Sequence, residues 1–188
     1  MHLARLEPTP RFARAELEGL VRLLASDSSA TLGYASMACW AAARDEANRA
    51  ALGELGVVDG CAHVLASSAQ LGTKELALGA LWLCACDART AVRCALHGAV
   101  KLLVGIILYP LERSYVPAKT LAVGCLLQVA HAAGPDARTL VAQLEFGASL
   151  LDAVHDAESP PYLVMLAARL VFELSADGGA ANPARAEY

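Results

Sequence analysis

The sequence has no uninterrupted apolar run as long as the roughly 18–20 residues that a membrane-spanning helix needs. Its two most apolar stretches are both interrupted. Residues 74–86 are followed by Asp87, and residues 102–111 contain Gly105 and Pro110. We therefore expect no membrane span.

Charge is also scarce. Charged residues make up 18% of the chain, where about a quarter is usual for a soluble domain, and hydrophobic residues make up 56%. The 15 Lys and Arg residues are scattered, and the net charge is −4. Nucleic-acid binding that is independent of sequence needs a concentrated basic surface, so we expect no nucleic-acid partner. The apolar excess suits stacked layers, or a subunit that is covered by its neighbours.

The common catalytic motifs are absent from the sequence: it contains no serine nucleophile elbow, no glycine-rich phosphate loop and no HExxH. Cys84 and Cys86 point about 200° apart on a helix and cannot bind one ion together. Cys94 and His97 share a helix face and form half of a possible metal site, without an evident second half. We expect no cofactor and no metal. A small helical metal-binding protein or enzyme that uses Cys94 and His97 stays as an alternative.

The six cysteines have a simpler interpretation. Five of them fall where a helical pattern calls for a small apolar residue. We expect them to be reduced core residues in a reducing compartment.

Helical segments fill the chain, and no alternation of period two predicts a strand. Four segments match in register: Ala35–Trp40, then Ala77–Trp82 after a shift of 42, and Ala122–Leu127 and Ala167–Phe172 after further shifts of 45. Gly56 and Gly98 are also 42 apart and are placed to end a short helix in the left-handed conformation. A period of 40–47 residues with two or three helices per unit predicts an all-α solenoid.

The register also sets the predicted boundaries. Residues 1–10 form a flexible N-terminal tail, residues 11–175 form the repeat domain, and residues 176–188 form a C-terminal tail. Within the domain, 11–43 is a partial repeat, and 45–86, 87–132 and 136–175 are full repeats. The last helix of the first full repeat is expected over Lys74–Cys86.

The first full repeat resembles armadillo repeats. It reads Asn48-Arg49, then Leu55-Gly56-Val57-Val58, Val64-Leu65 and Leu76-Ala77-Leu78-Gly79-Ala80-Leu81, which is similar to the family pattern of a short helix, a glycine, a second helix and a long third helix. The resemblance implies a right-handed armadillo-like superhelix of about three full repeats plus a partial N-terminal repeat.

The resemblance also implies a binding groove lined by the third helices. Peptide-binding members of the family carry a tryptophan there and an asparagine four residues later. At those positions this chain has four other pairs: Met37 and Ala41, Gly79 and Leu83, Gly124 and Gln128, and Arg169 and Glu173. None of these pairs matches the family pattern, and a peptide-binding, transport-type receptor stays as a second alternative. We expect Trp40 and Trp82, three residues further on, to face the core.

From this pattern we predict a partner-binding strip that would receive an amphipathic helix or a neighbouring subunit. It consists of Met37, Ala41, Gly79, Leu83, Gln128, Arg169 and Glu173. We predict a second contact at the C-terminal helix through Leu166, Leu170 and Phe172, because little sequence follows to cover that side. Ile106–Tyr109 with Leu111 is a further apolar segment, for which burial is the favoured interpretation.

These patterns together predict a non-catalytic protein-interaction or scaffold module, a subunit of a larger assembly. Its expected partners are proteins. The expected location is the cytoplasm, with a cytoskeletal or ciliary structure as an alternative.

Overall fold

The structure is a computed structural model that describes residues 10–67, 69–109, 115–156 and 158–176. Within these ranges the chain forms helices and no strand, so the predicted all-α fold is confirmed. The helices are α1 (Arg14–Leu23), α2 (Ser29–Ala42), α3 (Glu46–Glu54), α4 (Val57–Ala66), α5 (Leu71–Cys84), α6 (Ala88–Leu96), α7 (Ala99–Leu108), α8 (Val116–Ala132), α9 (Pro135–Ala142), α10 (Gly147–His155) and α11 (Pro161–Ala176). Except for Pro10 and Ala176, the two predicted tails lie outside the described residues.

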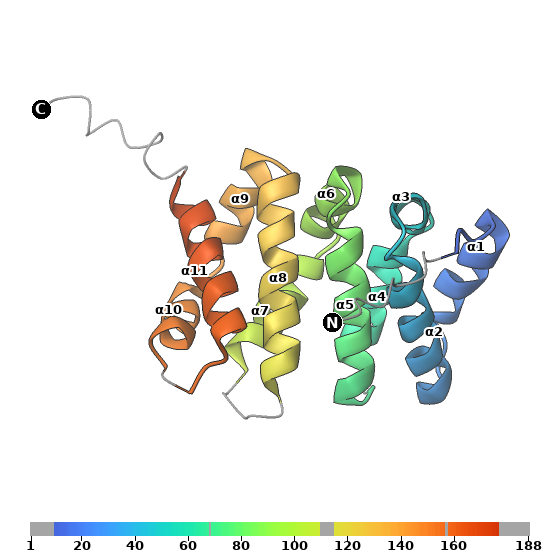
Figure 1. Ribbon diagram of the computed structural model, residues 1–188, viewed down its shortest axis with the longest axis horizontal. Coiled ribbons are helices and arrows are strands. Elements are labelled where there is room, and N and C mark those ends of the chain that lie inside the picture. Colours follow the sequence, from blue (N-terminus) through green and yellow to red (C-terminus); the bar gives the residue numbers. More distant parts are fainter. Residues whose placement is uncertain (1–9, 68, 110–114, 157, 177–188) are drawn as a thin grey trace, which may run out of the picture.

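The helices are arranged in repeating layers (Figure 1). The four longest helices, α2, α5, α8 and α11, lie side by side, and each packs against the next one along the chain. The short helices α3, α6 and α9 follow one another in the same way, as do α4, α7 and α10. Each full repeat therefore contributes a first, a second and a third helix, and α1 and α2 act as the second and third helices of a partial repeat.

Two chemically distinct signals delimit the short first helices. Asp45 and Asp87, 42 residues apart, cap α3 and α6 by accepting hydrogen bonds from the backbone N–H of Asn48 (3.1 Å) and Thr90 (3.0 Å). Gly56 and Gly98 follow these helices with φ of 94° and 77°, the left-handed conformation that glycine adopts without a steric cost. The helix ends predicted at these glycines are confirmed.

Helix α5 begins at Leu71, three residues before the predicted start at Lys74, and ends at Cys84. Gly72 and Thr73, which precede the predicted start, therefore lie within its first turn. The apolar segment at the end of α7 is divided as well: Ile107 is buried, Leu108 and Tyr109 are about half exposed, and Leu111 lies outside the described residues.

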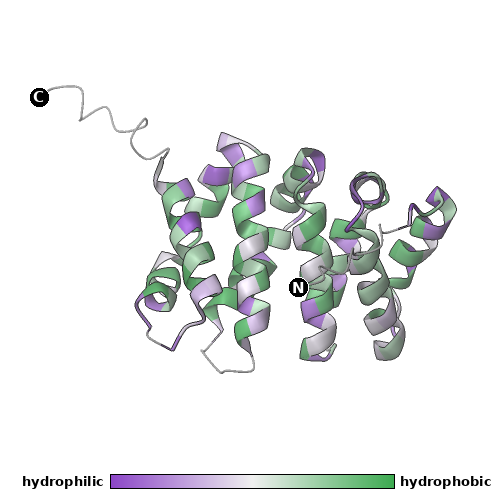
Figure 2. Cartoon of the chain, in the orientation of Figure 1, coloured by the Kyte–Doolittle hydropathy of each residue, from purple (hydrophilic) through white to green (hydrophobic). Residues whose placement is uncertain are grey.

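The core runs between the layers as one cluster of Leu, Val, Ala and Cys side chains. Five cysteines belong to it, as predicted from their helical positions: Cys39, Cys61, Cys84, Cys94 and Cys125. Burial raises the pKa of Cys39 and of Cys94 to about 12, because a thiolate is poorly solvated there. Hydrophobic residues also extend along the exposed sides of the long helices, and hydrophilic residues gather toward helix ends and loops (Figure 2).

Among the described residues, no single helix is long and apolar enough to cross a membrane; only α6 and α7 taken together, with a bend of 75° between them, meet the length and composition requirements.

Candidate functional site

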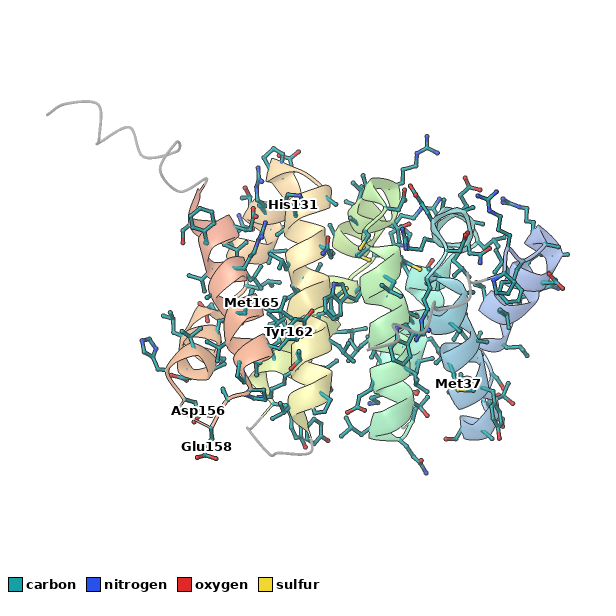
Figure 3. The ribbon with its side chains drawn as sticks, viewed as in Figure 1. Met37, His131, Asp156, Glu158, Tyr162 and Met165 are labelled. Carbon is teal, nitrogen blue, oxygen red and sulfur yellow. The ribbon has the colours of Figure 1, made fainter. Side chains whose placement is uncertain are left out.

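The long helices α2, α5, α8 and α11 form a broad surface, here called the third-helix face. Met37 lies on it at α2, and His131, Tyr162 and Met165 lie on it at α8 and α11 (Figure 3). This surface contains most of the predicted strip. Its character changes from one junction between helices to the next.

At the junction of α2 and α5, Trp40 lies over Gly79. A Cβ atom at residue 79 would lie 3.0 Å from the indole of Trp40, so only glycine allows this approach without displacement of the ring. The guanidinium of Arg44 stacks 5.9 Å from the centre of the same ring. Gly79 is therefore a buried seat for the indole rather than an open surface position, and that part of the predicted strip is wrong.

The junction of α5 and α8 repeats this arrangement more tightly. A Cβ atom at Gly124 would lie 2.7 Å from the indole of Trp82. On the far side, the ring of Trp82 meets the ring of Tyr162 on α11, with 6.3 Å between ring centres. The ring of Trp82 therefore crosses α8 at Gly124 and reaches α11, so that it fills the middle of the third-helix face. Both tryptophans pack against the core, as expected from the sequence, and both stay partly exposed.

The junction of α8 and α11 is open. Leu127 takes the register position of Trp82, and Arg169 takes that of the two glycines. Between them lies a groove of about 430 Å³ that is lined by Leu127, Gln128, His131, Met165, Leu166, Arg169 and Glu173. The three polar residues predicted for this end of the strip are thus brought together.

Glu173 is the centre of the polar cluster in this groove. Its side chain is 14% exposed, and its Oε1 lies 3.6 Å from Arg169 Nη2 and 3.7 Å from His131 Nδ1. Gln128 lines the same groove, and its amide can both donate and accept hydrogen bonds. The cluster can therefore bind backbone or polar side-chain groups of a partner.

A second hollow, of about 390 Å³, lies between the N-terminal halves of α2 and α5. Its walls include Gly33, Tyr34, Met37, Thr73 and Leu76. Tyr34 and Met37 are 71% and 49% exposed, so an apolar surface is available there. Of the other strip residues, Ala41 is exposed and Leu83 is half-buried.

The predicted C-terminal contact needs correction. Leu166 and Leu170 are buried, because they face α8 and α10 within the core of the last repeat. Those two residues were wrongly predicted to be surface contacts. Phe172 is 70% exposed, and Met165 and Tyr162 are about half exposed on the same helix. The exposed apolar surface of α11 is therefore formed by Tyr162, Met165 and Phe172 and not by the two buried leucines.

The two residues of the metal-site alternative lie in different environments. Cys94 is fully buried, whereas His97 Nδ1 lies 3.0 Å from Asp59 Oδ1 near the surface. In the described ranges, no group of three or more His, Cys, Asp or Glu side chains could hold a metal ion.

Sequence reasoning missed three members of this site: His131, Tyr162 and Met165. His131 stands four residues before Pro135 at the end of its helix, and nothing in its own spacing points to Glu173, 42 residues away. Tyr162 and Met165 do share one side of α11 with Arg169, at helical spacing, and this signal was available.

No protein-family model matches the sequence, and no curated protein sequence matches it. Solved structures do match the fold. An engineered protein is 20% identical, with a TM-score of 0.72 over 85% of this chain and 62% of its own. A designed armadillo repeat protein is 16% identical, with a TM-score of 0.73 over 84% of this chain and 64% of its own.

Another designed armadillo repeat protein, in complex with the peptide (KR)4, is 17% identical, with a TM-score of 0.73 over 88% of this chain and 72% of its own. The chain thus spans less than two thirds of the length of the first two structures. The likeness at these identities is one of fold. It establishes that the chain has the armadillo-like repeat fold that its sequence predicts.

Proposed function

We propose that this chain is a non-catalytic protein-binding module whose third-helix face binds an amphipathic helix of a partner protein. The arrangement that supports the proposal is the pair of hollows on this face, one lined by uncharged residues and one that contains charged side chains, on either side of a centre that Trp82 closes. The armadillo-like fold, which typically serves as a protein-binding scaffold, is consistent with it.

The sideways spacing of the two open junctions suits a helix of ordinary length. Packed helices lie about 8–10 Å apart, so the α2–α5 and α8–α11 junctions are separated by roughly 20 Å. A helix covers that distance with about 13 residues at its rise of 1.5 Å per residue. Its apolar side chains would contact Tyr34 and Met37, and its polar end would meet Gln128, Arg169 and Glu173.

The alternative of a peptide-binding transport-type receptor has less support. The (KR)4 peptide is basic, and it belongs to a designed neighbour. Here the tryptophan–asparagine pairs of peptide-binding members are missing, and Arg169 adds a positive charge at the open junction.

The core cysteines support a reducing compartment such as the cytoplasm as part of the proposal.

Photocrosslinking tests the proposal. A benzophenone amino acid is placed at Met165 on the third-helix face, and in a matched protein at Leu108 on α7. These side chains are 53% and 49% exposed. We expect one protein to crosslink from residue 165, with crosslinking suppressed by excess unlabelled chain, and no such product from residue 108. The reverse pattern would show that the partner binds on the side of the second helices, α4, α7 and α10.

A further inference from the structure

The lysines of this chain are gathered in one place. The sequence contains three, Lys74, Lys101 and Lys119, and its other basic residues are arginines and five histidines. All three line two neighbouring hollows that share Tyr109. This region lies outside the two hollows of the third-helix face.

The larger of the two is a cavity of about 330 Å³ between the layer of α4 and α5 and the layer of α7 and α8. Its walls are mostly apolar, with Leu78, Leu102 and Ile106 among them. The rings of Tyr109 and Tyr115 stack at one side, with 4.6 Å between their centres. An apolar side chain that entered this cavity would therefore lose contact with water on several sides.

Gly105 keeps the cavity open. It lines the cavity from the middle of α7, and a Cβ atom built at this residue would meet no atom within 4 Å. Glycine in a helix interior costs about 1 kcal/mol relative to alanine. The packing of the described residues gives no reason for that cost, whereas space for a bound group does.

Among the described residues, the charge at the cavity is positive. Lys74 and Lys101 line it, and no acidic residue does in the part of the chain that the structure describes. Neither lysine forms an ion pair with a described carboxylate, in contrast to Arg14, Arg22 and Arg169. Glu75 follows Lys74 in the sequence but does not line the cavity.

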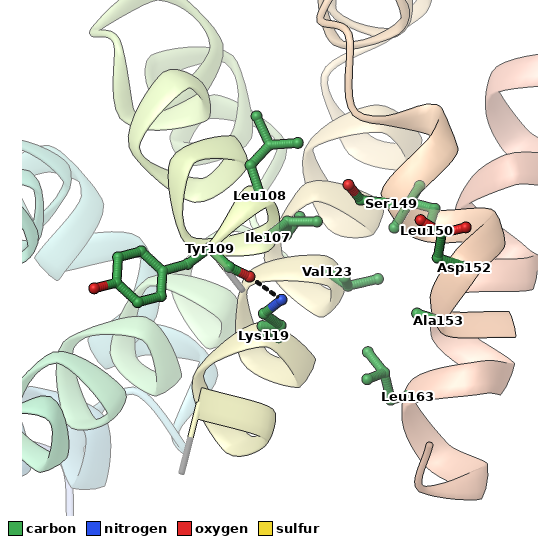
Figure 4. A pocket seen from close by; sticks show the side chains of 10 residues that line it. All are labelled: Ile107, Leu108, Tyr109, Lys119, Val123, Ser149, Leu150, Asp152, Ala153 and Leu163. Atoms are coloured by element: carbon green, nitrogen blue, oxygen red, sulfur yellow. Dashed lines mark hydrogen bonds between the residues drawn. The ribbon is translucent and has the colours of Figure 1, made fainter. Parts of the chain in front are cut away.

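Lys119 adds a third positive charge on the other side of Tyr109. It is 6% exposed and donates a hydrogen bond to the Tyr109 carbonyl (Figure 4). Its own hollow, of about 190 Å³, contains Asp152 on the opposite wall, so an anion is less favoured there. The ring of Tyr109 points away from that wall (Figure 4).

From this geometry we propose that the cavity at Gly105 binds an acidic, apolar peptide segment of a protein partner. One apolar side chain enters the cavity, and carboxylates on both sides of it pair with Lys74 and Lys101. Complementary charge at the rim steers such a segment and selects against basic ones. The inference goes beyond the function proposed above, because it concerns a different surface and a partner of defined charge.

The test uses the full chain and a fluorescein-labelled synthetic peptide in which Phe-Leu is flanked on each side by Asp-Glu. Fluorescence anisotropy should show binding that weakens with added salt. The double variant Lys74→Glu/Lys101→Glu should bind at least ten-fold more weakly. Gly105→Phe, which fills the cavity without a change of charge, should do the same while its circular dichroism stays unchanged.

The matched control is Arg22→Glu/Arg89→Glu, which makes the same charge change at two exposed arginines away from the cavity. It should bind within two-fold of the unaltered chain, as should Met37→Glu on the third-helix face. Equal binding of a peptide with Lys-Lys flanks, full binding by Gly105→Phe, or no binding of the acidic peptide at millimolar concentration would each overturn the proposal. So would binding of dodecanoate in place of the peptide, which would assign the cavity to an anionic amphiphile.

Discussion

The α5–α8 and α8–α11 junctions share one helical arrangement but present different surfaces. At the first, Trp82 lies on Gly124 and fills the space between the helices. At the second, Leu127 and Arg169 stand at the matching positions, and a groove that contains the Glu173 carboxylate remains. The comparison teaches that the repeat sets the backbone, while one residue pair per junction decides whether the surface is closed or open.

The largest expected effect is at the closed junction. Gly124→Leu should lower the free energy of unfolding by about 3 kcal/mol, because the new side chain would overlap the indole of Trp82. Urea denaturation followed by circular dichroism measures this. Gly72→Leu is the control, since a Cβ atom there meets nothing within 4 Å, and its change should stay below about 1 kcal/mol. Equal costs at both glycines would mean that Trp82 does not close the junction.

At the open junction the expected effect is on binding. Arg169→Glu places a second carboxylate beside Glu173 and should weaken partner binding at least ten-fold, or about 1.4 kcal/mol. Titration of the purified variants with the partner that crosslinking identified measures this affinity. Arg22→Glu is a matched control, because Arg22 also pairs with a glutamate four residues away. Similar losses in both variants would point to a nonspecific effect of charge.

Two glycines within helices differ in packing: Gly79 contacts the indole of Trp40, whereas Gly105 has open space beside it. Gly105→Ala should raise the stability by about 0.5–1 kcal/mol, because the methyl group meets nothing and alanine is the better helix former. Gly79→Ala should gain less, or lose stability, because the methyl group would press on Trp40. Thermal unfolding of the two single variants gives the comparison. An equal gain at both positions would remove the evidence that Trp40 is seated on Gly79.

The last prediction concerns the core that both junctions share. Near neutral pH a thiol reagent should modify only the exposed Cys86 in the folded chain and all six cysteines in guanidinium. Burial raises the pKa of Cys39 and Cys94 above that of an unfolded thiol. The free energy of unfolding is therefore not lowered by thiol ionisation below about pH 9. It should fall as the pH rises from about 9 toward 12, because unfolded thiols then lose protons that folded ones retain. Rapid modification of several thiols in the folded chain would contradict the buried assignment.

The sequence allowed the layers to be predicted better than the surfaces. The register of Ala35, Ala77, Ala122 and Ala167 predicts four third helices because small residues repeat where layers approach, and the helices formed there. The roles of Gly79 and Trp40 could not be read from one repeat, since each depends on the neighbouring layer. Leu166 and Leu170 were misplaced for a related reason: an apolar residue of the last helix can face either the core or the open edge. His131 and Glu173 meet only through the packing of α8 and α11.

Hydrogen–deuterium exchange on the chain, with and without the partner that crosslinking identified, tests the central claim most directly. Slower exchange on binding should appear in α8 and α11 around residues 127–132 and 165–173, and in α2 around Met37, with little change in α4 and α7. Protection confined to α4, α7 and α10, with α8 and α11 unchanged, would contradict the assignment of the third-helix face as the binding surface.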